Sequence, residues 1–127
     1  MAQSTLSPDE RIARITFGTV YPLYLEKVTK KGRTLEELNQ VIEWLTGFDS
    51  EKIAELATQN ITFESFFQQA ELNRNAHLIS GVVCGIRVEE IQNPLTQKIR
   101  YLDKLVDELA KGKKMEKVLR MNTQEEL

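Results

Sequence analysis

The sequence predicts a single all-α domain, and three observations support this prediction. Apolar residues recur at intervals of three and four along most of the 127 residues, which is the period of an amphipathic helix. Helix-capping residues precede most of these stretches, and glycine follows several of them. Only three prolines and six glycines punctuate the chain, and no Gly/Ser-rich linker divides it. We therefore expect a compact bundle of about seven helices spanning residues 1–127, with flexible tails at 1–9 and 122–127.

The composition is that of an ordinary globular protein. The 17 Lys and Arg residues nearly balance the 19 Asp and Glu residues, and 41% of the chain is hydrophobic. One Cys forms no internal disulfide, and one Cys with one His excludes a structural zinc site of the four-cysteine or the two-cysteine, two-histidine kind. No stretch approaches the length of a membrane helix, and the N-terminus lacks the features of a signal peptide. We expect a cytoplasmic protein without a metal or cofactor.

Two helices are expected at the start of the chain. Residues 7–10, Ser-Pro-Asp-Glu, form a capping box with proline in the first helical position. Gly18 interrupts this first helix. A second apolar stripe follows and contains Pro22, which a helix tolerates in its first turn, so we expect the second helix to begin near Thr19. Gly32, after two lysines, ends it.

Three further helices follow, each with its own start signal. Thr34 opens a second capping box, and Gly47 ends the helix that it begins. Asp49 or Ser50 caps the next helix, and Thr62 caps a short one. This short helix carries three phenylalanines that we expect in the core, with an oligomer interface as the alternative: Phe63, Phe66 and Phe67.

The segment 78–91 fits two structures. Its β-branched residues and glycines suit a buried strand, but nothing else in the chain resembles a partner strand. Its apolar residues also follow helical spacing, so we predict a buried helix with Cys84 in the core. Gly81 and Gly85 then share one face, which another helix can approach closely. A ladder of backbone hydrogen bonds here would contradict this prediction.

The clearest helix spans residues 94–111, with Asn93 as its cap and Pro94 in its first position. We expect it to form the core layer together with the helix at 78–91. A last short helix is expected between Lys113 and Met121.

Long strings of this sequence are characteristic of one bacterial family. The most specific strings are Lys31-Gly32-Arg33-Thr34, Trp44-Leu45-Thr46-Gly47-Phe48, Gly81-Val82-Val83-Cys84-Gly85-Ile86-Arg87-Val88-Glu89-Glu90-Ile91 and Ile99-Arg100-Tyr101-Leu102-Asp103-Lys104-Leu105. Over roughly residues 12–120 the chain resembles the family named domain of unknown function 2200. The resemblance implies a small, all-helical, cytoplasmic bacterial protein. It supplies no activity and no catalytic residues.

One group of polar residues is a candidate ligand site. Arg87, Arg100, Tyr101 and Asp103 are expected near the junction of the two core helices, where Arg and Tyr can hold a carboxylate or a phosphate. The favoured alternative is an internal network of ion pairs. His77 is a further candidate because histidine exchanges protons near neutral pH, and its alternative is an ordinary loop or cap residue.

Two basic runs stand far apart in the sequence. Their members are Lys27, Lys30, Lys31 and Arg33, and then Lys111, Lys113, Lys114, Lys117 and Arg120. Together they can form a phosphate-binding or nucleic-acid-binding face. However, the net charge is −2 and each run lies at an expected helix end, where cations complement the helix dipole. The sequence alone therefore disfavours nucleic acid as a partner.

These observations lead to three hypotheses about function. The sequence contains no P-loop, nucleophile elbow, metalloprotease or calcium-loop motif. We favour a binding or interaction module without catalytic residues, with a homodimer or another protein partner meeting its exposed aromatics and the Gly81/Gly85 face. The second hypothesis is an enzyme or small-anion binder centred on Arg87, Arg100 and Tyr101. The third is a nucleic-acid-binding accessory protein that uses its basic runs.

Overall fold

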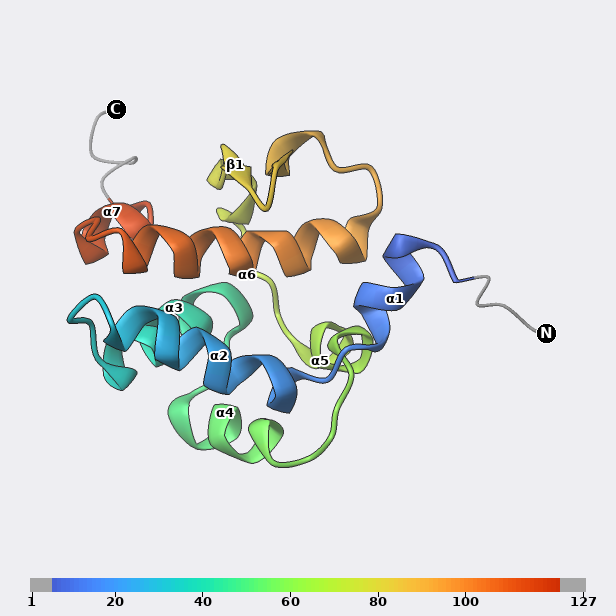
Figure 1. The fold of residues 1–127 in the computed structure, drawn as a ribbon, viewed down its shortest axis with the longest axis horizontal. Coiled ribbons are helices and arrows are strands. Elements are labelled where there is room, and N and C mark those ends of the chain that lie inside the picture. Colours follow the sequence, from blue (N-terminus) through green and yellow to red (C-terminus); the bar gives the residue numbers. More distant parts are fainter. Residues whose placement is uncertain (1–5, 122–127) are drawn as a thin grey trace.

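The protein folds as a mostly helical domain, as predicted. A computed structural model describes residues 6–121, in which seven α-helices and one small hairpin are present (Figure 1). The elements are α1 (Pro8–Arg14), α2 (Phe17–Thr29), α3 (Leu35–Thr46), α4 (Ser50–Ala57), α5 (Phe63–Gln69), the 3₁₀ turn η1 (Ala76–Leu78), β1 (Val82–Val83), β2 (Ile86–Arg87), the 3₁₀ turn η2 (Val88–Glu90), α6 (Pro94–Ala110) and α7 (Met115–Val118).

Most of the predicted tail residues, 1–5 and 122–127, lie outside the described residues. Of the others, Pro8 and Asp9 belong to α1. Asp9 also accepts a 2.6 Å hydrogen bond from the Thr96 hydroxyl, so the start of α1 is attached to α6. None of the described helices has both the length and the apolarity that crossing a membrane requires.

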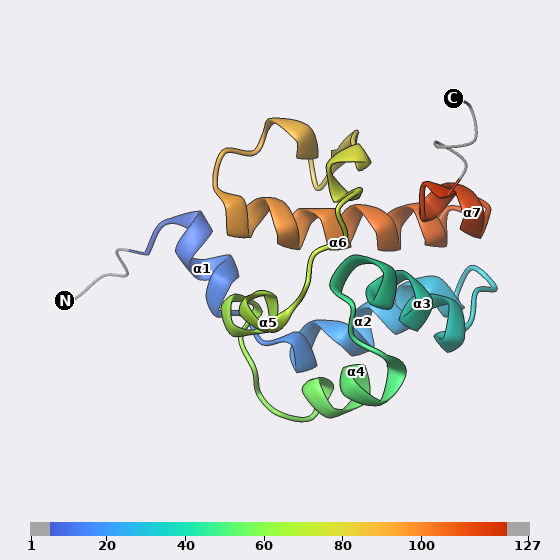
Figure 2. The ribbon, with the colours of Figure 1, turned by 180° about the vertical axis from the view of Figure 1, so that it is seen from behind.

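Helix α6 is the centre of the domain. It runs the length of the molecule, with α2, α3 and α4 on one side and the hairpin segment on the other (Figures 1 and 2). Each of α1, α2, α3, α5, α7, β1 and η2 packs against it. Its seventeen residues include three of the large aliphatic side chains that are fully buried, Ile99, Leu102 and Leu105. Burying each such side chain contributes about 1.5–3 kcal/mol.

The predicted helix starts are confirmed by their capping contacts. Ser7 and Thr34 both form complete capping boxes, in which the hydroxyl accepts a backbone N–H and a glutamate returns the contact. Asp49, Thr62 and Asn93 accept the same kind of bond with their side chains.

The start of α2 was predicted two residues too late. The helix begins at Phe17, not near Thr19, so Pro22 lies inside it. A tertiary contact fixes the earlier start: the Phe17 N–H donates to the Ile61 carbonyl at 2.9 Å, as part of an isolated bridge between Thr16 and Thr62. This bridge joins the α1–α2 junction to the start of α5.

Gly18 lies within α2, although the sequence predicted that it would interrupt the first helix. A Cβ atom here would collide with the backbone carbonyl oxygen of Ala57 at the end of α4. The glycine therefore permits α2 and α4 to pack closely, and this contact outweighs its poor helix propensity.

The predicted buried helix at 78–91 is wrong. The segment forms an antiparallel hairpin in which Val82 pairs with Arg87 and Val83 with Ile86. Its two-residue turn is Cys84-Gly85, and both residues have positive φ (53° and 78°), as a type I′ turn requires. Cys84 is consequently exposed rather than in the core, and the expected helical Gly81/Gly85 face does not exist. The sequence showed no partner for a strand in this segment because the partner strand, β2, lies within the segment itself.

The hairpin is attached to α6 by both apolar and polar contacts. Val83 and Val88 are buried beneath it. The Lys104 ammonium donates to the Val82 carbonyl at 3.1 Å, and the Gln97 amide donates to the Val88 carbonyl at 3.0 Å. These contacts hold the hairpin on the side of α6 opposite α2 and α3 (Figure 2).

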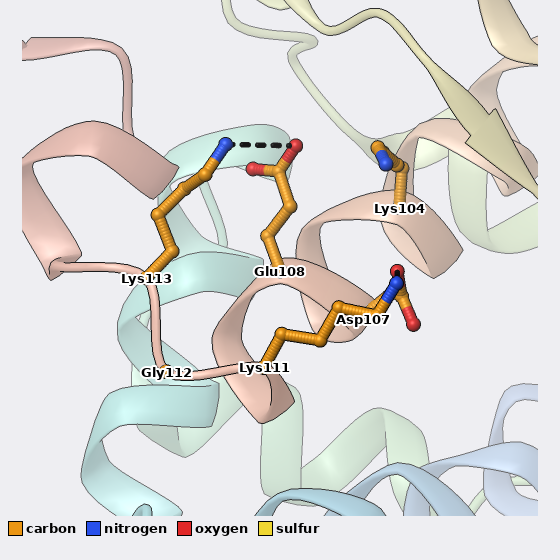
Figure 3. A pocket seen from close by; sticks show the side chains of 6 residues that line it. All are labelled: Lys104, Asp107, Glu108, Lys111, Gly112 and Lys113. Carbon is orange, nitrogen blue, oxygen red and sulfur yellow. Dashed lines mark ion pairs between the residues drawn. The ribbon is translucent and has the colours of Figure 1, made fainter.

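A buried ion pair secures the C-terminal helix. Glu108 is 5% exposed, and both of its carboxylate oxygens accept bonds from the Arg120 guanidinium, at 2.6 and 3.0 Å. Lys113 approaches the same carboxylate at 3.4 Å (Figure 3). The two-bond geometry keeps α7 against the end of α6.

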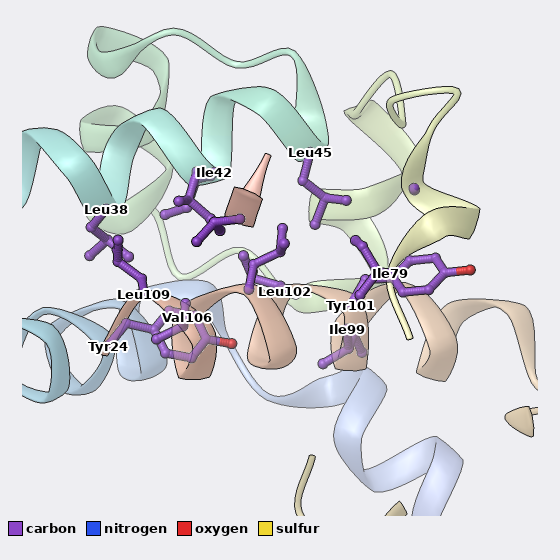
Figure 4. Packing of buried hydrophobic residues seen from close by; sticks show 14 of the residues in the cluster. Tyr24, Leu38, Ile42, Leu45, Ile79, Ile99, Tyr101, Leu102, Val106 and Leu109 are labelled. Carbon is purple, nitrogen blue, oxygen red and sulfur yellow. The ribbon is translucent and has the colours of Figure 1, made fainter. Parts of the chain in front are cut away.

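The core lies between α6 and the first five helices (Figure 4). A cluster of aromatic side chains fills the part of the core between α2 and α5, where the rings of Phe17 and Phe66 stack with centroids 4.4 Å apart. Phe63, Phe66 and Phe67 are all buried, which confirms the core prediction and leaves them no role on an exposed interface.

A substitution at the hairpin turn tests the corrected structure. Cys84→Asn should stabilise the protein by up to about 1 kcal/mol, because asparagine adopts positive φ more readily than most residues. Cys84→Val should destabilise it by about 1–2 kcal/mol, because β-branched residues are strained there. Urea denaturation measures both. A loss of stability with asparagine, as expected for a polar group buried in a helix, would contradict the hairpin.

Candidate functional site

Three of the five candidate ligand residues, Arg87, Arg100 and Asp103, form ion pairs within the protein. Arg100 lies 2.8 Å from Asp103 on the same helix, and the opposite Asp103 oxygen accepts a 2.5 Å hydrogen bond from the Tyr24 hydroxyl. Burial and the nearby Asp103 charge raise the pKa of Tyr24 well above its ordinary value. The phenol is therefore protonated at neutral pH and acts as a donor. We call Tyr24, Arg100 and Asp103 the Tyr24 group, and it connects α2 to α6.

The two arginines of the predicted cluster are both engaged with carboxylates. The Arg100 side chain is 22% exposed, its Nε is buried, and its Nη1 also lies 3.4 Å from the Cys84 sulfur. Arg87 lies on the hairpin and pairs with Glu89 at 3.6 Å. The sequence favoured an internal ion-pair network for these residues, and the observed contacts are of that kind.

The hollow at the C-terminal end of α6 is crowded with opposite charges. It measures about 370 Å³. Lys111 pairs with Asp107 at 3.2 Å, and Lys113 pairs with Glu108 across it (Figure 3). Because two carboxylates line this hollow beside its lysines, it suits an anionic ligand poorly.

A second cleft brings the other two predicted residues together. It measures about 300 Å³ and lies between the segment 72–77 and the first half of α6. His77 contributes from the segment and Tyr101 from the helix. The lining side chains are Leu72, Asn73, Arg74, Ala76, His77, Pro94, Gln97, Lys98 and Tyr101. We call it the Tyr101 cleft.

One asparagine shapes the loop side of the Tyr101 cleft. The Asn73 side chain donates to the Trp44 carbonyl at 3.0 Å, and its backbone N–H donates to Leu45 at the same distance. The Asn73 side-chain oxygen also accepts the Asn75 N–H at 2.8 Å. The loop is thereby fixed to the end of α3, and the short turn η1 that follows presents His77 on the surface.

The helix side of the cleft is one stripe of α6. Pro94, Gln97, Lys98 and Tyr101 occupy positions i, i+3, i+4 and i+7, which share a helical face. Arg100 and Tyr101 are consecutive and leave the helix about 100° apart, since an α-helix turns that much per residue. This divergence explains why Tyr101 lies in the cleft and Arg100 in the Tyr24 group.

Two hydrogen-bonding groups in the cleft are free to meet a ligand. Tyr101 is 7% exposed, and no described residue forms a hydrogen bond with its hydroxyl, which points away from the packed aliphatic side chains (Figure 4). Burial raises the pKa of Tyr101, so its proton is retained at neutral pH. His77 Nδ1 lies 2.9 Å from the Arg74 carbonyl oxygen. That oxygen can only accept, so Nδ1 carries the proton and Nε2 remains available.

The charge around the cleft has one sign. Arg74 and Lys98 are its only permanently charged lining residues among those the structure describes, and both are cationic. Neither forms an ion pair with a described residue. The cleft therefore combines two cations that no described residue pairs, a protonated phenol, an imidazole and the carbon surface of Leu72, Ala76 and Pro94.

Sequence reasoning did not select Arg74, Gln97 or Lys98. Gln97 and Lys98 share the helical face of Tyr101, so the helical period could have added them to the candidate site. The contribution of Arg74 depends on the tertiary bonds of Asn73, and no sequence pattern signals these bonds.

Comparison with known proteins identifies relatives without an assigned activity. The family described as "Uncharacterized protein conserved in bacteria (DUF2200)" matches residues 11–120. The chain is also similar to the crystal structure titled "Crystal structure of uncharacterized protein SP1917", with 39% sequence identity and a TM-score of 0.82. That match covers 93% of this chain and 96% of the other. No curated protein matches the sequence.

The Tyr24 group predicts a loss of stability at alkaline pH. The pKa of Tyr24 is higher in the folded state than the unfolded value of 10.0, so the stabilisation is complete below pH 10 and declines above it. Tyr24→Phe should lower the free energy of unfolding by about 1–3 kcal/mol at pH 7, because Asp103 loses a donor. The difference from wild type should shrink by up to about 1.4 kcal/mol per pH unit above pH 10. Urea titrations from pH 8 to 11.5 measure it, and a constant difference would contradict the assignment.

Proposed function

The chain belongs to the DUF2200 family of uncharacterised bacterial proteins, and we propose that it is a binding protein whose Tyr101 cleft holds a small organic anion. One observation carries the proposal. The cleft contains the Tyr101 hydroxyl, which bonds to no described residue, and both charged residues that line the cleft are cationic. An anionic ligand can accept a hydrogen bond from this hydroxyl while the two cations neutralise its charge.

The proposed contacts match the chemistry of a carboxylate or a phosphate. Such a group accepts hydrogen bonds only, which suits the protonated Tyr101 hydroxyl. The Arg74 guanidinium has a planar fork that can meet two oxygens of the anion at once, and Lys98 adds a second positive charge on the facing helix. These three residues come from both walls of the cleft, so one anion can bridge them.

The rest of the ligand should be apolar and small. Leu72, Ala76, Pro94 and the Tyr101 ring supply carbon surface to the cleft. Its volume, about 300 Å³, lies at the lower end of ordinary ligand sites. An aromatic or branched aliphatic acid, or the corresponding phosphate ester, has this combination of size and charge.

Binding rather than catalysis is the role that these groups suit. Because burial raises the pKa of Tyr101, its hydroxyl donates a hydrogen bond at neutral pH but does not readily release its proton. The cationic groups orient and neutralise an anion without supplying a nucleophile.

A titration followed by NMR tests the proposal. Benzoate and phenyl phosphate are added separately to the ¹⁵N-labelled full chain, with benzylamine as a probe of similar shape and opposite charge. We expect either anion to shift the amide signals of residues 72–77 and 94–101, and benzylamine to leave them unchanged. The tighter anion identifies the preferred head group. Equal shifts with benzylamine, or anion shifts elsewhere only, would refute the proposal.

Two substitutions should weaken this binding by different amounts. Arg74→Gln should weaken it about 10-fold or more, because it removes a charge-assisted hydrogen bond. Tyr101→Phe removes one neutral donor and should weaken it about 3- to 10-fold. Arg14→Gln, on exposed α1, changes the net charge equally and serves as the control. Unchanged affinity in both cleft variants would place the anion elsewhere.

A further inference from the structure

The fold brings the two basic runs of the sequence together. The Arg33 guanidinium donates to the Lys113 carbonyl at 3.2 Å, which joins the α2–α3 loop to the α6–α7 loop. Lys27 of α2 lies 3.4 Å from Asp107 of α6. Residues separated by 80 positions in the sequence therefore form one surface. We call the residues 26–37 and 104–120 the basic end.

Charge is distributed unevenly between the basic end and the remainder of the chain. The basic end contains ten Lys and Arg residues and six Asp and Glu residues. The remainder of the chain contains seven basic and thirteen acidic residues. The basic end therefore carries a formal charge of +4 and the remainder −6. In the sequence analysis, the net charge of −2 argued against a polyanionic partner. Because the positive charge is concentrated at the basic end, the net charge no longer argues against such a partner there.

The lysines of the basic end are accessible to a partner. Lys31, Lys114 and Lys117 are exposed, and they form no ion pair with any described residue. The side chain of Lys30 is 70% exposed although it contacts Glu26, whose side chain is 61% exposed. Exposed pairs of this kind are weak, so a phosphate can compete for this cation as well.

We propose that the basic end binds the phosphate backbone of duplex nucleic acid. Residues 26–37 and 104–120 contain no Phe, Trp or Tyr. The surface consequently has no platform for stacking single-stranded bases, and it lacks the aromatic anchors that concentrate binding energy at protein interfaces. Exposed lysines on loops and helix ends suit sequence-independent contacts with phosphates. This proposal does not depend on the Tyr101 cleft, which lies on a different part of α6.

Salt dependence provides the primary test. Fluorescence anisotropy measures binding of the full chain to a fluorescein-labelled 20-base-pair DNA duplex. Contacts with three to five phosphates should weaken the affinity by about 40- to 500-fold between 50 and 200 mM salt. A fluorescein-labelled glutamate 20-mer tests an acidic polypeptide as the partner instead. No binding of the duplex at 50 mM salt, or tighter binding of the peptide, would overturn the proposal.

A pair of variants with equal net charge separates a specific surface from general electrostatics. The triple variant Lys31→Gln/Lys114→Gln/Lys117→Gln should bind the duplex at least 10-fold more weakly at 50 mM salt. Its logarithmic salt slope should fall by about 3, one for each lost contact. The control Arg14→Gln/Lys52→Gln/Arg87→Gln has the same net charge and should bind like wild type. Circular dichroism confirms that both variants are folded. Equal weakening in both would refute a surface at the basic end.

Discussion

The burial of α6 is the constraint on which the rest of the structure depends. This helix is seventeen residues long, and its aliphatic side chains at 99, 102, 105 and 109 are almost fully excluded from solvent. One flanking element cannot cover such a helix, so α2 and α3 cover one side and the hairpin segment covers the other. Only the two ends of α6 and a narrow stripe along it remain accessible to a ligand or a partner. The Tyr101 cleft occupies that stripe, and the basic end occupies the C-terminal end.

Polar contacts then fix the elements around α6 in one arrangement. Tyr24 donates to Asp103 and thereby sets the position of α2, while Arg120 binds Glu108 and positions α7. Buried or half-buried pairs of this kind add little net stability, but breaking one leaves a costly unpaired charge. Alternative packings of the helices that separate these partners are therefore disfavoured.

The helices could be predicted because their signals are local. Ser7, Thr34 and Asn93 each mark a helix start within a few residues, and the caps form as expected. The hairpin could not be predicted in this way, because its turn is Cys84-Gly85 rather than the more diagnostic Asn-Gly or Asp-Gly. Its valines and isoleucine also fit a helical period over so short a span.

The candidate site was only partly accessible from the sequence for a similar reason. Arg100 and Tyr101 are neighbours in the chain, but the helix directs them to different surroundings. His77 meets Tyr101 because Asn73 fixes the intervening loop to Trp44, a contact 29 residues away. Likewise, the two basic runs became one surface only through the packing of α2 against α6. Sequence patterns indicate which residue types are suited to a site, whereas the tertiary fold determines which of these residues become neighbours.

Hydrogen–deuterium exchange of the native protein tests the central role of α6 most directly. If the other elements depend on this helix, the amides of residues 98–109 should exchange only through global unfolding. Their free energies of exchange should then equal the free energy of unfolding measured with urea. The account would be contradicted if these amides exchanged at a clearly lower free energy while those of α3 stayed protected, because the remaining helices would then hold together without α6.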